Sequence, residues 1–239
     1  PAGRGQKLRE SEVKIAAREM GLPVLQPEKL RDPEFLTALR ALQPDLGIVI
    51  AFRMLPEAVW ALPRLGTFNL HASLLPQYRG AAPINWALIN GETCTGVTTF
   101  LLNHEIDKGA ILAQRTEPIR PDDNAGTLYE RLMRIGAELV TQTVERIAAG
   151  DLQPVEQSPA GEETLCPAPK IFRENCEIDW SETGERIVNL VRGLAPYPAA
   201  WTTIRLDGEE IATIKIYEAH FEPGCGYGLS LIHIDAADD

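Results

Sequence analysis

The stretch Leu46-Gly-Ile-Val-Ile-Ala-Phe52 indicates the class of fold. It has the length of a strand and no alternation of polar and apolar residues, which is typical of a parallel strand covered on both faces. Strands that alternate with helices along the rest of the chain predict an α/β fold, a doubly wound and mostly parallel sheet with helices on both faces. The further strands are expected at 67–70, 95–102 and 110–117, and the helices at 11–20, from 33, at 83–90 and at 127–150.

Capping residues predict where these helices begin and end. Ser11 can accept a hydrogen bond from the first turn of a helix that ends near Met20. Asp32, followed by a proline at the first helical position, opens a second helix. Thr127-Leu-Tyr-Glu130 has the pattern of a capping box and predicts the start of a long helix that ends at Gly150.

The chain changes character after this long helix. Prolines interrupt a polar stretch without periodicity at 151–170, which predicts a linker. Beyond it, Ser181 can cap a helix that runs to about Leu194, and Asp207-Gly208 predicts the turn of a β-hairpin. We therefore expect an α/β domain at 1–150, a linker at 151–170 and a smaller β-rich domain at 171–239.

The composition excludes several classes of protein. The 239 residues are 44% hydrophobic and 24% charged, which is typical of a soluble globular protein. Apolar runs are far shorter than the roughly 20 residues that span a bilayer, and the opening segment is too polar for a signal peptide. Four cysteines without zinc-ligand spacing favour reduced thiols and a cytoplasmic location.

The charge is unevenly distributed. A formal net charge of -11 argues against a general polyanion-binding protein, because nucleic-acid affinity rests on Lys and Arg. Residues 1–18, however, hold five basic and two acidic side chains, a local charge of +3. This end could contact a phosphate backbone, although a solvated basic segment is the simpler interpretation from charge alone.

Candidate catalytic residues follow two of the expected strands. Asn69 and His71 are two positions apart, so a strand directs both side chains to one face, and His can carry a proton near neutral pH. Asp107 follows another strand and could return to the same edge of the sheet. From spacing alone, His71 could equally be a structural residue, and Asp107 could form a turn with Gly109.

Other catalytic patterns are missing from the sequence. It contains no G-x-G-x-x-G and no G-x-x-x-x-G-K-[ST], so it predicts neither a dinucleotide site nor a phosphate loop. It contains no G-x-S-x-G around Ser73 and no H-E-x-x-H, so neither a hydrolase triad nor a metal site is predicted.

Two motifs identify a resemblance. Phe68 to Ile84, which includes Asn-Leu-His-Ala-Ser-Leu-Leu-Pro, is followed by Gly96-Val-Thr and by Ile106-Asp-Lys-Gly109. Together they closely resemble the folate-dependent formyltransferases. The resemblance implies a Rossmann-like catalytic domain at 1–150, a partial OB-like domain at 171–239, and Asn69, His71 and Asp107 as catalytic residues.

The resemblance also implies substrates and binding residues. The formyl donor would be 10-formyltetrahydrofolate, with no metal, and the acceptor would be the amino group of methionyl initiator tRNA. Arg4 and Lys7 lie in a segment that is similar to the basic tRNA-contacting loop of such enzymes, although Glu12 stands where they usually carry proline. The folate would bind between two walls, one formed by Phe52, Arg53, Met54 and Leu55 and the other by Ser73, Leu74, Leu75 and Pro76.

Two alternatives remain open, and the family pattern adds expectations about the ends of the chain. The acceptor could be a small amine, such as an amino sugar or glycinamide ribonucleotide, or the chain could be a non-catalytic folate- or RNA-binding module. Members of the family carry a strand, a helix and a strand before the basic loop. We therefore expect a truncated first βαβ unit, a shortened C-terminal domain, exposed apolar sheet edges and low stability. We expect the protein to be a monomer.

Overall fold

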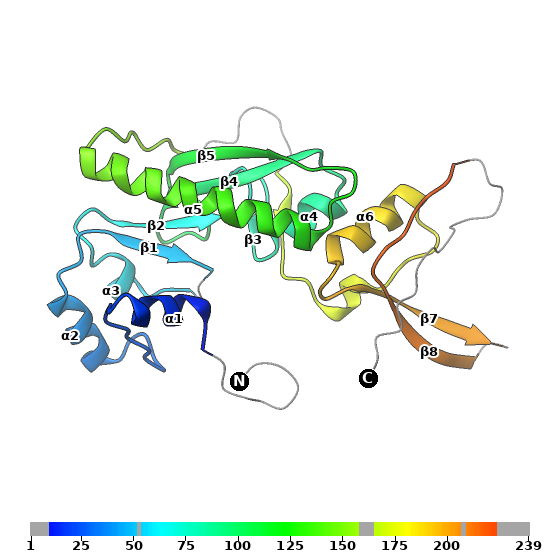
Figure 1. The fold of residues 1–239 in the computed structure, drawn as a ribbon, viewed down its shortest axis with the longest axis horizontal. Coiled ribbons are helices and arrows are strands. Elements are labelled where there is room, and N and C mark those ends of the chain that lie inside the picture. Colours follow the sequence, from blue (N-terminus) through cyan, green and yellow to red (C-terminus); the bar gives the residue numbers. More distant parts are fainter. Residues whose placement is uncertain (1–9, 52–53, 158–164, 207–208, 224–239) are drawn as a thin grey trace.

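A computed structural model describes residues 10–51, 54–157, 165–206 and 209–223 (Figure 1). The α/β arrangement expected from the sequence is present, followed by a smaller α/β part. The helices are α1 Glu12–Glu19, α2 Pro33–Ala41, α3 Glu57–Trp60, α4 Pro83–Ile89, α5 Ala125–Ala149, the 3-10 helix η1 Arg173–Cys176 and α6 Gly184–Leu194. The strands are β1 Gly47–Ile50, β2 Thr67–His71, β3 Arg79–Gly80, β4 Cys94–Leu101, β5 Ile111–Pro118, β6 Pro167–Ala168, β7 Ala200–Leu206 and β8 Glu209–Ile216.

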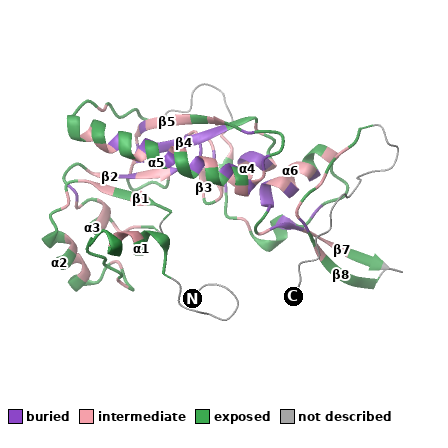
Figure 2. Cartoon of the chain, viewed as in Figure 1, coloured by how far each residue is buried: buried purple, intermediate pink, exposed green. Residues whose placement is uncertain are grey.

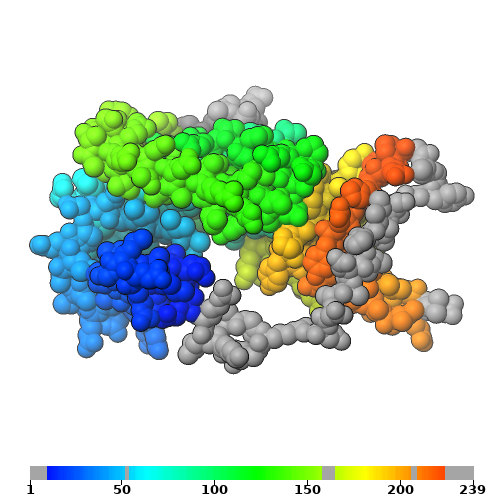
Figure 3. Space-filling model, in the orientation of Figure 1, coloured from blue at the N-terminus to red at the C-terminus, as the bar shows by residue number. Residues whose placement is uncertain are grey.

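The central sheet is mixed and has the strand order β1-β2-β4-β5. β1 and β2 pair in parallel, whereas β4 runs antiparallel to both β2 and β5. α5 crosses one face of this sheet and forms a continuous ridge in the space-filling view (Figure 3). The helix approaches β2 closely at Gly136, where a Cβ atom would lie only 2.8 Å from the Leu70 side chain.

The core lies between α4, α5 and the sheet. Apolar residues of α5 recur on one face at Leu128, Leu132 and Leu139, and all three are buried. They pack with Leu88 of α4 and Val97 of β4 in one cluster. Figure 2 shows buried residues concentrated along β4, α4 and the inner side of α5, so strand β2 has a well-packed neighbour in β4.

Strand β1 differs from its prediction. The sequence predicts a strand covered on both faces, but residues of β1 alternate between partly buried and exposed. Ile48 and Ile50 are 46% and 56% exposed, so no described element covers that side of the strand. An apolar run without polar residues therefore does not mean that β1 is buried on both faces.

The helix starts also differ in detail. The capping box of α5 uses Asn124 and Thr127, three residues before the predicted one, because the Asn124 side chain accepts from the Thr127 amide. The cap of α6 is Thr183, because Ser181 instead bonds the Asp179 carboxylate. The predicted caps of α1 and α2, Ser11 and Asp32, are confirmed.

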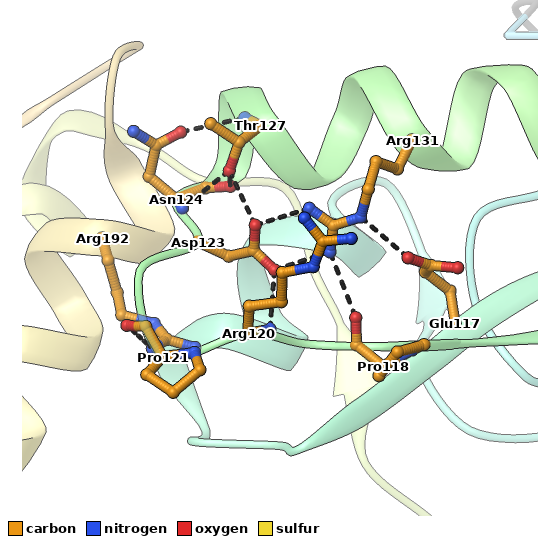
Figure 4. Close-up of polar contacts among 9 residues, drawn as sticks. All are labelled: Glu117, Pro118, Arg120, Pro121, Asp123, Asn124, Thr127, Arg131 and Arg192. Carbon is orange, nitrogen blue, oxygen red and sulfur yellow. Dashed lines mark hydrogen bonds and ion pairs between the residues drawn. The ribbon is translucent and has the colours of Figure 1, made fainter.

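A network of ion pairs and hydrogen bonds connects the start of α5 to the end of β5 and to α6 (Figure 4). Arg131 donates to both oxygens of Asp123 at 2.6 Å and to Glu117 at 2.7 Å. Arg192 of α6 reaches the same turn, where it donates to the carbonyl of Pro121 at 3.1 Å. α6 also packs directly on α4, so the two parts of the chain share a contact surface.

The segment after α5 was predicted to be a linker, and it contains ordered contacts. β6, within that range, pairs in parallel with β3. In the C-terminal part, β7 and β8 form the predicted antiparallel hairpin, whose Asp207-Gly208 turn lies outside the described residues. The division of the chain into two domains and a linker stays a prediction.

Candidate active site

Strand β2 positions two of the three predicted catalytic residues. Asn69 pairs with Phe100 and His71 with Thr98 of β4, so both stand in regular sheet with the two-residue alternation that places them on one face. His71 is only 6% exposed, and its ring lies edge-on to that of Phe100 with centroids 6.4 Å apart. The imidazole is therefore held in a packed, apolar surrounding.

A main-chain carbonyl orients His71. Nε2 of the imidazole lies 2.8 Å from the carbonyl oxygen of Tyr78. A carbonyl can only accept, so Nε2 carries the hydrogen and donates it. In the neutral ring Nδ1 is then the nitrogen with a free lone pair. His71 thus presents Nδ1 as its proton-accepting atom.

Asp107 lies opposite that atom. Its Oδ2 is 4.0 Å from Nδ1 of His71, and its side chain is 14% exposed. The same Oδ2 accepts a hydrogen bond of 3.0 Å from the amide of Gly80. At this distance the carboxylate acts on the imidazole through charge rather than through a direct hydrogen bond.

The side-chain amide of Asn69 lacks one hydrogen bond. Its Oδ1 is buried and has no hydrogen-bond partner among the described residues. A buried polar atom without a partner costs about 1–3 kcal/mol, and such atoms are uncommon. The described residues therefore leave the hydrogen-bonding capacity of the Asn69 amide partly unused.

The second predicted folate wall is an ordered turn supported by β4 and β5. Thr98 donates to the Ser73 carbonyl at 2.6 Å, and Gln114 donates to the Leu75 carbonyl at 2.8 Å. Ser73 and Leu75 are buried, whereas Leu74 and Pro76 are partly exposed. The two exposed side chains are therefore the ones with surface available to a ligand.

Only two of the other predicted binding residues lie within the described part of the chain. Met54 is 77% exposed and Leu55 is partly buried. Phe52, Arg53, Arg4 and Lys7 lie outside the described residues. Their assignment to folate and tRNA stays a prediction.

Sequence reasoning missed residues that support the catalytic group. Arg79 and Gln157 both bond the carbonyl of Asp107, and Tyr78 supplies the acceptor for His71. Tyr78 and Arg79 stand inside the quoted motif, which could have signalled them. Gln157 lies in the polar stretch after α5 and gave no signal in the sequence.

Two surface hollows lie away from the candidate residues. Two hollows of about 350 and 610 Å³ lie around α2, and none of the candidate residues lines them. Within the described ranges, no three His, Cys, Asp or Glu side chains gather where a metal ion could bind. In the same ranges, no helix combines the length and apolar character needed to cross a membrane.

Two family models match the sequence. The one described as formyl transferase covers residues 1–144, and the one described as formyl transferase, C-terminal domain, covers residues 170–232. Among curated proteins, the methionyl-tRNA formyltransferase of Parabacteroides distasonis is 56% identical over 98% of this chain and 74% of its own length. That of Bacteroides fragilis is 54% identical over 93% of this chain and 69% of its own length.

Solved structures agree with this pattern. HypX from Aquifex aeolicus in complex with tetrahydrofolic acid matches with a TM-score of 0.62 and 26% identity, over 79% of this chain and 32% of that one. A likely sugar N-formyltransferase from Mycobacterium tuberculosis matches with a TM-score of 0.64 and 25% identity, over 88% of this chain and 93% of that one.

Proposed function

The chain belongs to the formyltransferase family, and we propose that it transfers the formyl group of 10-formyltetrahydrofolate to the amino group of methionyl initiator tRNA. The observation that carries formyl transfer is the approach of the Asp107 carboxylate to Nδ1 of the buried His71, which stands two residues after Asn69 on β2. The choice of acceptor is supported by methionyl-tRNA formyltransferases that are more than 50% identical to this chain over the aligned residues.

The reaction requires two charges to be stabilised. The neutral amine attacks the formyl carbon, which forms an N–C bond and a tetrahedral intermediate with an oxyanion and a surplus proton. The bond between that carbon and N10 of the folate then breaks, and N10 of the departing tetrahydrofolate takes up the proton. We assign the Asn69 amide as a hydrogen-bond donor to the oxyanion, a role whose loss typically costs about 3 kcal/mol.

His71 is suited to move the proton. Because Nε2 is occupied by the Tyr78 carbonyl, Nδ1 is free to accept the proton that the attacking amine loses. The carboxylate of Asp107, 4.0 Å away, stabilises the positive charge that the ring then carries. The burial of both side chains strengthens this interaction relative to one in water.

The binding assignments extend this proposal. Members of this family use folate derivatives, and we propose that Leu74 and Pro76 form one wall of the folate site, facing the segment 52–55. Arg4 and Lys7 would contact the acceptor end of the tRNA, while the acidic remainder of the chain discourages non-specific binding. We further propose a monomer that acts in the cytoplasm, where initiator tRNA is charged and used.

An acceptor assay tests the function. The purified protein is incubated with 10-formyltetrahydrofolate and either methionyl initiator tRNA or a nucleotide-linked amino sugar. We expect formyl-methionyl product with the tRNA. The likeness to a likely sugar N-formyltransferase makes the amino sugar the competing acceptor. Formylation of the sugar without formylation of the tRNA would overturn the proposal.

Two variants test the catalytic assignment. His71→Ala and Asn69→Ala should each lower kcat about 100-fold, the usual cost of losing a general base or an oxyanion donor. His220→Ala is the matched control, because His220 is an exposed residue after β8 whose bond is to Glu218. Near-normal turnover by the His71 variant would refute the mechanism.

A further inference from the structure

The segment that follows α5 returns to the catalytic loop. Val155 exchanges two backbone hydrogen bonds with Ile111, the first residue of β5, at 2.7 and 2.8 Å. This pairing lays the segment along the edge of the central sheet. It delivers Gln157 to the loop before β5, the loop that carries Asp107.

The amide of Gln157 is fully used in holding that loop. Its Nε2 donates to the carbonyls of Asp107 at 3.0 Å and Gly109 at 2.7 Å. Its Oε1 accepts from Arg79, at 2.7 Å from Nη2 and 3.1 Å from Nε. The Nε atom of Arg79 also donates to the carbonyl of Asp107, at 3.1 Å. The side chains of Gln157 and Arg79 therefore bond each other, and both donate to the Asp107 carbonyl. We call this pair of side chains the bracket.

The bracket bonds Asp107 where the backbone of this residue is left-handed. Its φ is 54°, a conformation that glycine, asparagine and aspartate adopt more readily than other residues. Two donors on its carbonyl, from Arg79 and Gln157, fix the orientation of this residue. At Gly109 the loop is packed so closely that a Cβ would collide with the carbonyl of Leu101.

The residue after Arg79 holds the carboxylate of Asp107. The amide of Gly80, the residue after Arg79, donates to Oδ2 of Asp107 at 3.0 Å. Arg79 and Gly80 thus hold the carbonyl and the carboxylate of one residue from adjacent positions of β3. A movement of either contact would change the 4.0 Å separation between Oδ2 and His71.

We propose that Gln157 and Arg79 are positioning residues that set the Asp107 carboxylate against His71. This inference rests on the proposed function of Asn69, His71 and Asp107. It assigns a role in catalysis to a side chain that follows α5 and lies 50 residues beyond the catalytic aspartate, with no direct contact to His71.

The first test is Gln157→Glu. Glutamate keeps the shape of the side chain and an acceptor for Arg79, but it places an oxygen against the carbonyls of Asp107 and Gly109. We expect kcat to fall 10- to 100-fold, with KM for both substrates within about two-fold. Gln153→Glu is the matched control, since Gln153 is exposed in the same segment and the charge change is identical. That control should retain full activity.

A double-variant cycle separates positioning from general loss of structure. Asp107→Asn keeps the shape of the side chain, and asparagine tolerates the left-handed backbone. If Gln157 acts through the carboxylate of Asp107, adding Gln157→Glu to this variant should lower kcat by less than two-fold. A full additional 10-fold loss in that background, or a Gln157→Glu variant whose defect lies in KM, would overturn the inference.

The outcomes also distinguish this inference from the proposed function. Normal turnover by Asp107→Asn alone would refute the catalytic assignment itself. An impaired Asp107→Asn with a fully active Gln157→Glu would refute only the positioning role. If Gln157→Glu does not fold, Arg79→Lys gives the same readout, because it keeps the charge and removes the forked contact to Gln157 and Asp107. Unchanged kcat in that variant would count against the inference.

Discussion

Replacing Asp123 by asparagine should destabilise the protein in a way that depends on pH. Asp123 is 4% exposed and accepts from Arg131 at both oxygens, from the Arg120 amide at 2.7 Å and from the Thr127 hydroxyl at 3.0 Å. Burial alone would raise the pKa of this carboxyl, but the donors outweigh burial and lower it from 3.8 to about 2. The asparagine side chain would keep the shape of the aspartate and lose its charge.

The pKa of Asp123 sets the size and the pH range of the effect. A group whose pKa is lower in the folded protein stabilises the fold above its ordinary pKa, and this stability is lost as pH falls toward the folded value. The shift corresponds to roughly 2–3 kcal/mol at pH 5 to 7, and to about half of that at pH 3. For a chain of this size, the melting temperature near neutral pH should fall by about 5–10 °C.

Denaturant unfolding at pH 7, 5 and 3 measures this difference directly. Asp123→Asn should lose roughly 2–3 kcal/mol of unfolding free energy at the two higher pH values and distinctly less at pH 3. Asp122→Asn is the control, since it removes the same charge from the exposed neighbouring residue and should change stability little. A destabilisation that is equal at all three pH values, or one reproduced by the control, would refute the electrostatic explanation.

Two further variants test a residue beside the site and the cap of α5. Tyr78→Phe removes the hydroxyl that donates to Glu92 at 2.6 Å, so unfolding free energy should fall by about 1 kcal/mol. Its kcat should stay within two-fold, because the backbone carbonyl that holds His71 remains; a large fall in kcat would show that the hydroxyl itself contributes. Asn124→Ala removes the cap of α5 and should cost about 1 kcal/mol in denaturant unfolding, with unchanged KM for both substrates. Equal stability of this variant and the parent would show that the capping box contributes nothing.

Local signals in the sequence predicted most of the elements. Asp32 followed by proline marked the start of α2, and glycine at 150 adopts the left-handed conformation expected at the end of α5. These features depend on hydrogen bonds between residues three or four apart, which a sequence displays directly. The caps of α5 and α6 were misplaced because several capping residues lie near each start and only packing decides between them.

Contacts between distant residues could not be predicted in the same way. The unalternating run of β1 indicated burial on two faces, yet Ile48 and Ile50 are exposed. The antiparallel placement of β4 between β2 and β5 also carries no local signature, because the apolar pattern of a buried strand is independent of its direction. Such features depend on which elements finally pack together.

His71 and Asp107 were singled out from the sequence as candidate catalytic residues, but the geometry between them depends on atoms that a sequence does not display. The carbonyl of Tyr78 orients His71, and a carbonyl at that position belongs to every amino acid. What is specific is the backbone angle, since Tyr78 has a φ of 58°. Its amide donates to the carbonyl of Cys166 at 2.7 Å and its hydroxyl donates to Glu92, so both ends of the residue are anchored.

These anchors give the segment after α5 a role on both sides of the catalytic pair. Cys166 holds the residue that orients His71, and β6 beside it pairs with Arg79 and Gly80 of β3. Gln157, earlier in the same segment, holds the carbonyl of Asp107. A stretch that composition identified as a connection between domains therefore contacts the supports of both catalytic side chains. Changes at Gln157, at Cys166 or in β6 should affect turnover before they affect substrate affinity, because these residues contact Asp107, Tyr78 and β3.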